Sequence, residues 1–357
     1  MPENISVSSP LEQLLKKAVR TQGGKFPRRN GTYFDHYTSI KQRLADKYYA
    51  VTGAALAQTG DRYTKHDISH VDDVIESAGQ MLGFGHDSHN PAYKNLEPYE
   101  VFALLLAILL HDAGNAIRRQ GHEKKAAEIL REVATATGMN DLEHLIISSI
   151  AQAHGGEMPD GNKDTITALM TDPEPNIGKI KIHARRLAAL VRLADELSEN
   201  YTRADEVAIE APGTPDVSLL ANYYCLLINP RIDFVGRSVH LAFHVDVKLL
   251  PRVFKIPKGN DQIEDIMFID YIAQRLEKCE RERRYCNRFL AGFASFDRIR
   301  AKLVILDNNR EIDTVPVDLE EVGYPSLSKT VKELEPKFDA CKLRDKHCLN
   351  AEQEQAQ

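Results

Sequence analysis

The chain has 357 residues, of which 43% are hydrophobic and 27% charged, and its formal net charge is −6 at pH 7. This composition predicts a folded protein with a sizeable core, and the length favours two domains or one large domain with an appended module. The weak negative charge excludes a global field that would draw the chain onto nucleic acid or an anionic membrane.

The sequence shows no secretory signal, no apolar run long enough to cross a membrane, and no recognisable disulfide or zinc pattern. The first residues lack the charged start and apolar run of a secretory signal. The longest apolar run, Val101 to Leu110, is shorter than the roughly 20 residues that cross a bilayer. Five scattered cysteines do not indicate a disulfide framework, and the spacing of Cys341 and Cys348 beside His347 fits no common zinc pattern. We therefore expect a soluble, cytoplasmic protein with no membrane partner.

The first two thirds of the chain carry a helical pattern. Apolar spacing from Leu11 to about Leu56 predicts two helices around the loop GGKFPRRNG. From Asp67 to Arg203 apolar residues recur at intervals of three and four, with two turn-rich interruptions. This stretch is predicted to form an all-helical block.

After Ala204 the pattern changes to short β-branched or alternating runs. EVAIEA, YYCLLIN, RIDFVG and SVHLAFHVDV predict mostly antiparallel strands. A long helix from about Asp261 to Phe293, a strand at RIRAKLVIL and a short helix near Ser328 to Leu334 are expected to follow, and AEQEQAQ reads as a frayed polar tail. The predicted class is mainly α, a helical core followed by a smaller α+β module with an antiparallel sheet. The predicted parts are an N-terminal helical extension (1–60), a helical domain (61–205), the α+β module (206–340) and a polar C-terminal tail (341–357).

The apolar run of the helical block ends in a His111–Asp112 pair. Imidazole and carboxylate are ligands that suit Mn, Fe, Ni, Zn or Mg, and two adjacent ligands can serve two ions. Alone, such a dipeptide more often caps a helix end. His86–Asp87, which no apolar helix precedes, is an example in the same chain.

Three further ligand-type residues, His70, His154 and Asp195, lie four residues from an apolar position on a predicted helix. Each is therefore expected to point inward. A buried aspartate without a partner is costly, whereas one bound to a divalent cation is not. His122 begins another predicted helix, where it is either a further inward imidazole or a surface residue. The pattern predicts a buried site that binds one or two divalent metal ions.

The order of these residues resembles that of the HD superfamily of metal-dependent phosphohydrolases over roughly residues 60–205. The resemblance implies that His70, His111, Asp112 and Asp195 hold one metal, and that Asp112 bridges to a second metal held by His122 and His154. Asn115 departs from the family's frequent HDxGK form, in which a lysine stands at this position. The matching segments are HVDDV at His70, LLHDAGN at His111, GHEKKAAEIL at His122, AQAHGG at His154 and LVRLADEL at Asp195.

The segment HDISHVDDV is similar to the HNxxHAxDV segment of cyclic-nucleotide phosphodiesterases. That similarity implies that His70 is a metal ligand and His66 a general acid, and an imidazole titrates in the right range to give a proton to a leaving oxygen. The alternative is that His66 enters the helix and hydrogen-bonds to groups behind the ligands. The spacing T-x-H-x-x-x-H at Thr64 also resembles HD modules of bacterial defence and signalling systems, which favours a bacterial enzyme directed at nucleotides.

These residues predict a hydrolase that cleaves phosphoester or phosphoanhydride bonds in nucleotides or other phosphorylated substrates by means of a metal-activated water. Two alternatives stay open. One is a metal-dependent nuclease on single-stranded nucleic acid, similar to the HD nuclease of type I CRISPR systems, and the other is a regulatory module that senses a nucleotide. The α+β module is free to cover the site, bind an effector or form a homo-oligomer. The catalytic residues are expected to be Asp112 and His66, and the candidates for binding substrate phosphate are Arg118, Arg119, Arg192 and Arg203.

Overall fold

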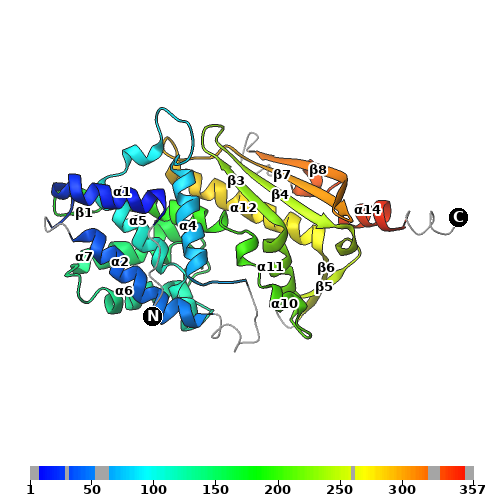
Figure 1. Ribbon diagram of the computed structural model, residues 1–357, viewed down its shortest axis with the longest axis horizontal. Helices are drawn as coiled ribbons and strands as arrows, with labels where there is room; N and C mark the ends of the chain where they lie inside the picture. The colour runs from blue at the N-terminus through cyan, green and yellow to red at the C-terminus, as the bar shows by residue number, and fades with distance from the viewer. Residues whose placement is uncertain (1–7, 29–31, 53–63, 259–261, 321–329, 350–357) are drawn as a thin grey trace. The chain divides into compact units, whose positions relative to one another are not determined.

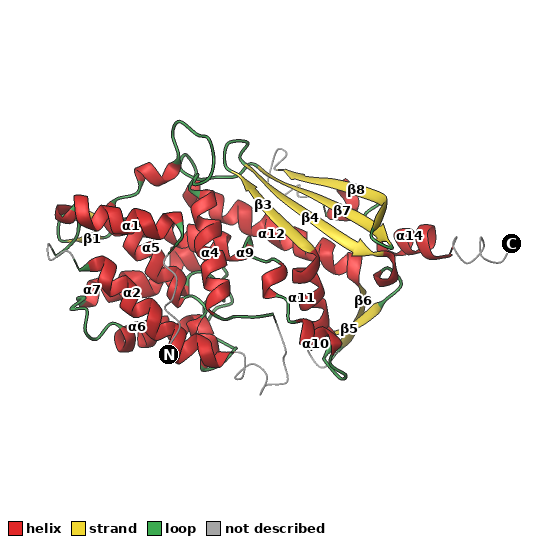
Figure 2. Cartoon of the chain, in the orientation of Figure 1, coloured by secondary structure: helices red, strands yellow, loops and turns green. Residues whose placement is uncertain are grey.

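The computed structural model describes residues 8–28, 32–52, 64–258, 262–320 and 330–349 (Figure 1). The contacts divide the chain into two compact units. The first comprises residues up to 59, 66–198 and 285–295, and the second comprises 60–65, 199–284 and the residues from 296 onward. The predicted class, mainly α with an α+β module, is confirmed by the distribution of helices and strands (Figure 2).

The first unit is helical. Its N-terminal part contains the two expected helices, α1 (Pro10–Thr21) and α2 (Tyr33–Leu44). A capping box, in which Ser9 and Glu12 each accept a backbone N–H of the other, fixes the start of α1. Besides short 3₁₀ helices, this unit contains the π-helix Ala45–Tyr49, α4 (Ile68–Met81), α5 (Pro98–Leu110), α6 (Ala126–Val133), α7 (Asp141–Gln152), α8 (Thr165–Leu169), the short hairpin of β1 (Asn176–Ile177) and β2 (Ile180–Lys181), and α9 (Ala184–Glu196).

Helix α5 is the centre of the first unit. All of its residues are buried, and it contacts α1, α2, α7 and α9. The stretch Pro98–Ala116 is long and apolar enough to cross a membrane, but its most apolar window is 94% buried inside the structure. Its hydrophobicity is therefore accounted for by a core position between other helices.

The larger sheet of the second unit contains β3 (Ile228–Asp233), β4 (Ser238–Asp246), β7 (Arg298–Asp307) and β8 (Arg310–Glu320), in the order β3-β4-β7-β8. The β3–β4 and β7–β8 pairs are antiparallel, whereas β4 and β7 are parallel, so the sheet is mixed. Two predicted strands are wrong, because EVAIEA forms helix α10 (Glu206–Glu210) and most of YYCLLIN belongs to α11 (Asp216–Leu227).

The remaining elements complete the second part of the chain. A hairpin of β5 (Val253–Pro257) and β6 (Ile263–Met267) stands where the long helix was expected to begin, and helix α12 spans Phe268–Leu290. The predicted short helix is confirmed as α13 (Val331–Leu334). The chain then forms α14 (Ala340–Arg344) and a π-helix (Asp345–Leu349), while the predicted frayed tail lies outside the described residues.

Candidate metal centre

Two groups of three ligand-type side chains form in the first unit. One contains His70, His111 and Asp195, and the other contains Asp112, His122 and His154. Within each group the nitrogen and oxygen atoms lie within 4.8 Å of one another. The structure therefore brings together all six residues that the sequence singled out for metal. They come from α4, the C-terminal end of α5, the 3₁₀ helix His122–Lys125, the turn after α7, and α9.

The carboxylate of Asp112 joins the two groups because its oxygens face different histidines. Oδ2 lies 3.6 Å from Nε2 of His70 and 3.6 Å from Nε2 of His111. Oδ1 lies 3.0 Å from Nε2 of His122 and 3.8 Å from Nε2 of His154. Ligand atoms that share one first-row ion at about 2.1 Å are themselves roughly 3.0–3.5 Å apart. The separations fit a carboxylate shared by two neighbouring cation positions.

Asp195 supplies the second carboxylate. Its Oδ1 lies 3.3 Å from Nε2 of His70 and 3.6 Å from Nε2 of His111. Both imidazoles are completely buried. The first group therefore presents two nitrogens and one carboxylate oxygen to a common point, and the Asp112 carboxylate adjoins that point from the other side.

Backbone hydrogen bonds hold three of the rings in one orientation. Nδ1 of His111 contacts the carbonyl of Ile108 at 2.7 Å, and Nδ1 of His154 contacts that of Ala151 at 2.7 Å. Nδ1 of His122 is 3.0 Å from the carbonyl of Arg119. A carbonyl only accepts, so each Nδ1 is the donor and each Nε2 is directed to the carboxylates. Histidines that bind metals are typically anchored in this way.

The His122 and His154 rings meet through their Nε2 atoms, which are 3.3 Å apart. With both Nδ1 atoms protonated, the neutral rings present two lone pairs to each other, next to an oxygen of Asp112. Three acceptors in so small a space repel one another unless a proton or a cation lies among them. This donor set therefore fits a divalent metal ion.

The electrostatics of the cluster favour positive charge. Burial alone would disfavour the ionised carboxylates, but the surrounding histidines hold the pKa of Asp112 and of Asp195 well below the usual value. Burial likewise opposes a charge on His111, yet Asp112 and Asp195 outweigh it and raise its pKa to about 9. For His154, burial and the charges of His111 and His122 lower the pKa to about 4. Two anionic carboxylates are thus available at neutral pH, and His154 keeps a free lone pair.

Gly114, in the HDAG segment, is required for the position of His122. A Cβ added to Gly114 would lie 2.1 Å from the backbone oxygen of His122. Only glycine allows the 3₁₀ helix Ala113–Ala116 to approach the segment that carries His122 so closely. Gly114 is not among the site residues predicted from the sequence, although a glycine two positions after Asp112 is a visible signal of close backbone approach.

His66 adjoins the same cluster. It precedes Asp67, which caps the N-terminus of α4, and its Nε2 is 3.9 Å from Oδ2 of Asp112. Nη1 of Arg119 lies 3.2 Å from Nε2 of His66 and 3.4 Å from Oδ1 of Asn115. A guanidinium only donates, so Nε2 of His66 is the acceptor in this arrangement. The role of His66 as general acid stays a prediction.

The four candidate arginines have different surroundings. Arg118 is exposed, whereas Arg119 contacts His66 directly. Arg192 is buried, donates to Thr165 and stacks on the ring of Tyr285. Arg203 belongs to the second unit and pairs with Glu199 there. Of these contacts, the one made by Arg119 reaches a residue beside the ligand cluster.

Asn115, which stands where the HDxGK form has lysine, is almost fully buried. Its Oδ1 accepts from Arg119, while its Nδ2 has no hydrogen-bond partner among the described residues. An amide cannot supply the positive charge of a lysine, but a buried unpaired donor is costly to maintain. Asn115 therefore offers one donor near Arg119 that the protein itself does not use.

Comparison with known proteins gives one family. No curated protein matches the chain. The family model described as HD-CE matches residues 60–278, which is more than half of the chain. This range includes all six ligand-type residues and His66. The chain carries an HD-type domain and belongs to the HD-CE family.

Proposed function

We propose that the protein is a metal-dependent hydrolase of phosphoester or phosphoanhydride bonds in nucleotides, acting as a cytoplasmic enzyme of bacteria. The proposal rests on the two carboxylate oxygens of Asp112. One oxygen faces His70 and His111, and the other faces His122 and His154. A shared carboxylate between two ligand sets suits a pair of divalent ions, the arrangement used for in-line displacement at phosphorus. The nitrogen and oxygen ligands favour Mn, Fe, Ni or Zn, and manganese is our first choice.

When bound, such ions activate a water molecule and offset the charge that develops on the phosphoryl oxygens. The chain's own residues would hold the ions and keep the histidine rings in the orientation that binding requires. Asp112 and Asp195 supply the negative charge at the centre, and backbone carbonyls fix the histidine rings so that Nε2 faces inward. Burial of His70, His111, Asp112 and His154 keeps bulk water away from these ligands and strengthens the electrostatic interactions among them.

Arg119 and His66 are proposed to act together on the substrate. In the present geometry the guanidinium donates to Nε2 of His66 at 3.2 Å. A substrate phosphate accepts hydrogen bonds from a guanidinium more strongly than a neutral imidazole does, because the phosphate is charged. Once Arg119 turns to the phosphate, Nε2 of His66 is free to take up a proton from solvent. The imidazolium then gives this proton to the leaving oxygen as the bond between phosphorus and that oxygen breaks.

The proposal is tested by a substrate panel. Purified protein supplied with Mn²⁺ is incubated with NTPs, dNTPs, cyclic mono- and oligonucleotides and single-stranded DNA, and the products are separated by chromatography. We expect turnover of at least one nucleotide that a chelator or Asp112→Ala abolishes. Asp87→Ala, which alters the His86–Asp87 pair in a loop, is the matched control and should keep full activity. Degradation of single strands with no turnover of any nucleotide would instead assign a nuclease and contradict the proposal.

A further inference from the structure

Among the described residues, one face of the four-stranded sheet of the second unit is open to solvent. Along β4, Val239, Leu241 and Phe243 are buried, whereas the side chains of His240 and Ala242 between them are accessible. Because successive side chains of a strand point to opposite faces, one face of the sheet is covered and the other is open to solvent. A groove of about 440 Å³ lies on the open face.

One row of cross-strand neighbours in this groove is strongly polar. Arg231, His240, Arg300 and Asp318 are paired in register across β3, β4, β7 and β8. Arg300 is 3.9 Å from Asp318, which is a long and weak ion pair at the surface. Arg231 has no acidic partner among the described residues. The row therefore carries two permanent cations and one carboxylate.

The adjacent row has a different character. Asn229, Ala242, Lys302 and Pro316 are in register across the same strands. The short side chain of Ala242 leaves the floor of the groove low, and Pro316 adds an apolar surface. Lys302 is exposed and, within the described ranges, has no acidic partner. Two apolar residues thus lie beside a cation in this row and next to the charged row.

The groove carries a net positive charge, whereas the chain as a whole carries a net negative charge. Arg231, Arg300 and Lys302 face one carboxylate, Asp318, although the formal net charge of the protein is −6. Arg300 and Lys302 lie on the same face of β7, and Arg231 lies on that face of β3, two strands away, so three cations gather here around one carboxylate and repel one another. An anion in the groove would offset the repulsion, and guanidinium groups are well suited to phosphate oxygens.

The volume of the groove and the residues that line it indicate which class of ligand fits. Its volume lies within the range of about 300–1,000 Å³ that is typical of small-molecule sites. No Phe, Tyr or Trp is among the lining residues, so the groove lacks the stacking surface with which proteins hold single-stranded nucleic acid. Cations on both sides of the low floor at Ala242, with the apolar Pro316 beyond them on β8, match a ligand that has phosphates at one end and a sugar and base at the other.

We propose that this groove binds a nucleoside triphosphate, with its phosphates over Ala242 between Arg231 on one side and Arg300 and Lys302 on the other, and its nucleoside over Pro316. The residues of the groove belong to the second unit, whereas the six ligand-type residues belong to the first. The groove therefore shares no residue with the metal centre. The inference does not depend on the proposed hydrolase activity.

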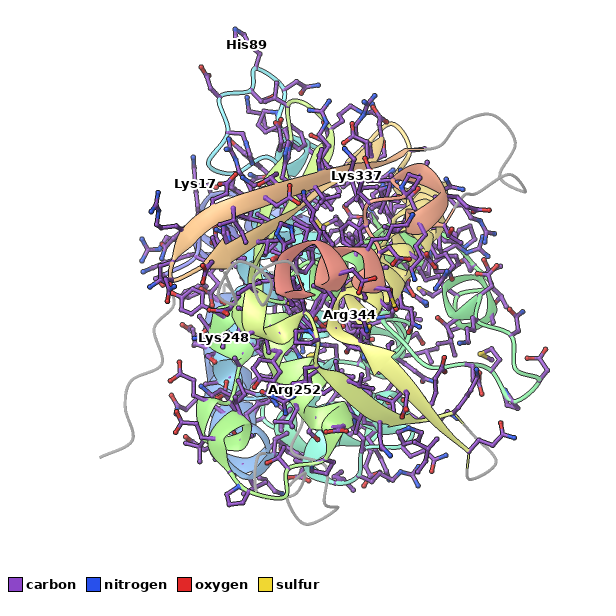
Figure 3. The ribbon with its side chains drawn as sticks, turned by 90° about the vertical axis from the view of Figure 1, so that its right-hand side faces the viewer. Lys17, His89, Lys248, Arg252, Lys337 and Arg344 are labelled. Carbon is purple, nitrogen blue, oxygen red and sulfur yellow. The ribbon has the colours of Figure 1, made fainter. Side chains whose placement is uncertain are left out.

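The test is calorimetric titration of the full-length protein with ATP and with GTP in the presence of a chelator. We expect one of them to bind, and expect Arg231→Gln and Arg300→Gln each to weaken its binding about tenfold, the usual effect of losing a charge-assisted hydrogen bond. Arg300→Lys, which keeps the charge, should recover part of the loss. Lys248→Gln is the matched control, because Lys248, labelled in Figure 3, is exposed in the turn after β4 and does not line the groove. Asp112→Ala should leave this binding unchanged.

Four results would overturn the inference. The first is the absence of ATP and GTP binding up to millimolar concentration. The second is binding that Asp112→Ala abolishes while Arg231→Gln and Arg300→Gln do not affect it, because the nucleotide would then occupy the metal centre. The third is equal affinity for inorganic tripolyphosphate, which has no nucleoside. The fourth is Arg231-dependent binding of a single-stranded oligonucleotide much tighter than that of ATP. Circular dichroism of each variant verifies that the substitution leaves the fold intact.

Discussion

The guanidinium of Arg119 lies 3.2 Å from Nε2 of His66, with the imidazole as acceptor. The backbone carbonyl of the same arginine is 3.0 Å from Nδ1 of His122. Arg119 therefore contacts both a candidate ligand and the candidate proton donor. The side chain of Arg119 contacts His66, whereas its backbone carbonyl anchors His122. A substitution of the side chain therefore leaves the anchor of His122 in place.

The first prediction separates His70 from His66. His70→Ala should lower the metal content, because its Nε2 faces both Asp112 and Asp195. His66→Ala should keep the metal and lose about 10²–10⁴-fold in rate on a substrate with a poor leaving group such as a ribose alkoxide, the usual size of general acid catalysis. The defect should shrink with a nitrophenyl phosphodiester, whose leaving group needs little protonation. If His66→Ala slows both substrates equally, or removes the metal, the assignment as an acid fails.

The second prediction concerns Gly114. In Gly114→Ala the new Cβ would meet the backbone oxygen of His122 at 2.1 Å, so the segment that carries His122 has to move. We expect the metal stoichiometry to fall from two ions to one, since His70, His111 and Asp195 are not displaced. Gly155→Ala is the matched control. Gly155 follows His154, and an added Cβ there meets nothing within 4 Å. Elemental analysis of both variants measures the difference, and equal stoichiometry would contradict this account of Gly114.

The helical part of the fold was predictable because its signals are local. The spacing of apolar residues in α4, α5 and α9 is visible in the sequence, and it also places the ligand-type residues on buried helix faces. The grouping of the six residues was not predictable in the same way. Which oxygen of Asp112 faces which histidine depends on how the helices pack, and nothing in the sequence reports it.

The second unit was harder to predict from the sequence, because the patterns that indicate its strands are short and the pairing of those strands depends on tertiary contacts. EVAIEA alternates like a strand, yet Asp205 accepts a hydrogen bond from Ala208 and caps a helix there. Strand β6 passes directly into α12 at Phe268 without a Gly, Pro or Asn between them, so no boundary was visible. The hairpin of β7 and β8 was predictable from the sequence, because Asn tolerates the positive φ angles of a tight hairpin turn and two Asn residues stand together at 308 and 309. Both adopt positive φ angles in the structure. The parallel pairing of β4 and β7 has no local signal at all.

The third prediction separates nucleotide hydrolysis from nuclease activity by salt. An enzyme that follows a long single strand neutralises several phosphates, so its activity should fall steeply as salt rises. An enzyme that binds one nucleotide should show a much weaker dependence, and we expect that behaviour. Initial rates with a nucleotide and with a long single strand, measured across a range of salt concentrations, give the two slopes. Turnover of the long strand alone, with a steep slope, would favour the nuclease.

The fourth prediction concerns pH and the buried Glu12. Its carboxylate accepts hydrogen bonds from Tyr37 at 2.6 Å and from Lys41 at 2.9 Å. Burial by itself would raise the pKa of Glu12, but these two partners outweigh it and lower the pKa below the ordinary value of 4.5. A carboxylate with a lowered pKa in the folded state stabilises the protein above its unfolded pKa, and this stabilisation is lost as pH falls through the folded pKa.

Glu12→Gln should therefore lower the free energy of unfolding at pH 7 by about 1–3 kcal/mol, because Lys41 loses a charged partner in the interior. The difference between wild type and variant should stay constant down to about pH 5 and narrow below it. Urea unfolding at several pH values measures this difference directly. Glu210→Gln, at an exposed position, is the control and should show little change. A difference that grows as the pH falls would contradict the assigned ionisation of Glu12.

The most direct test of the central claim is the number of metal ions bound to wild type, Asp112→Ala and Asp87→Ala, measured by elemental analysis after loading with Mn²⁺ and desalting. The two oxygens of Asp112 face both ligand sets, so removing this carboxylate should affect both positions. We predict two ions for the wild type and for Asp87→Ala and none for Asp112→Ala. Two ions retained by Asp112→Ala, or no ion bound by the wild type, would contradict the metal centre described for this fold.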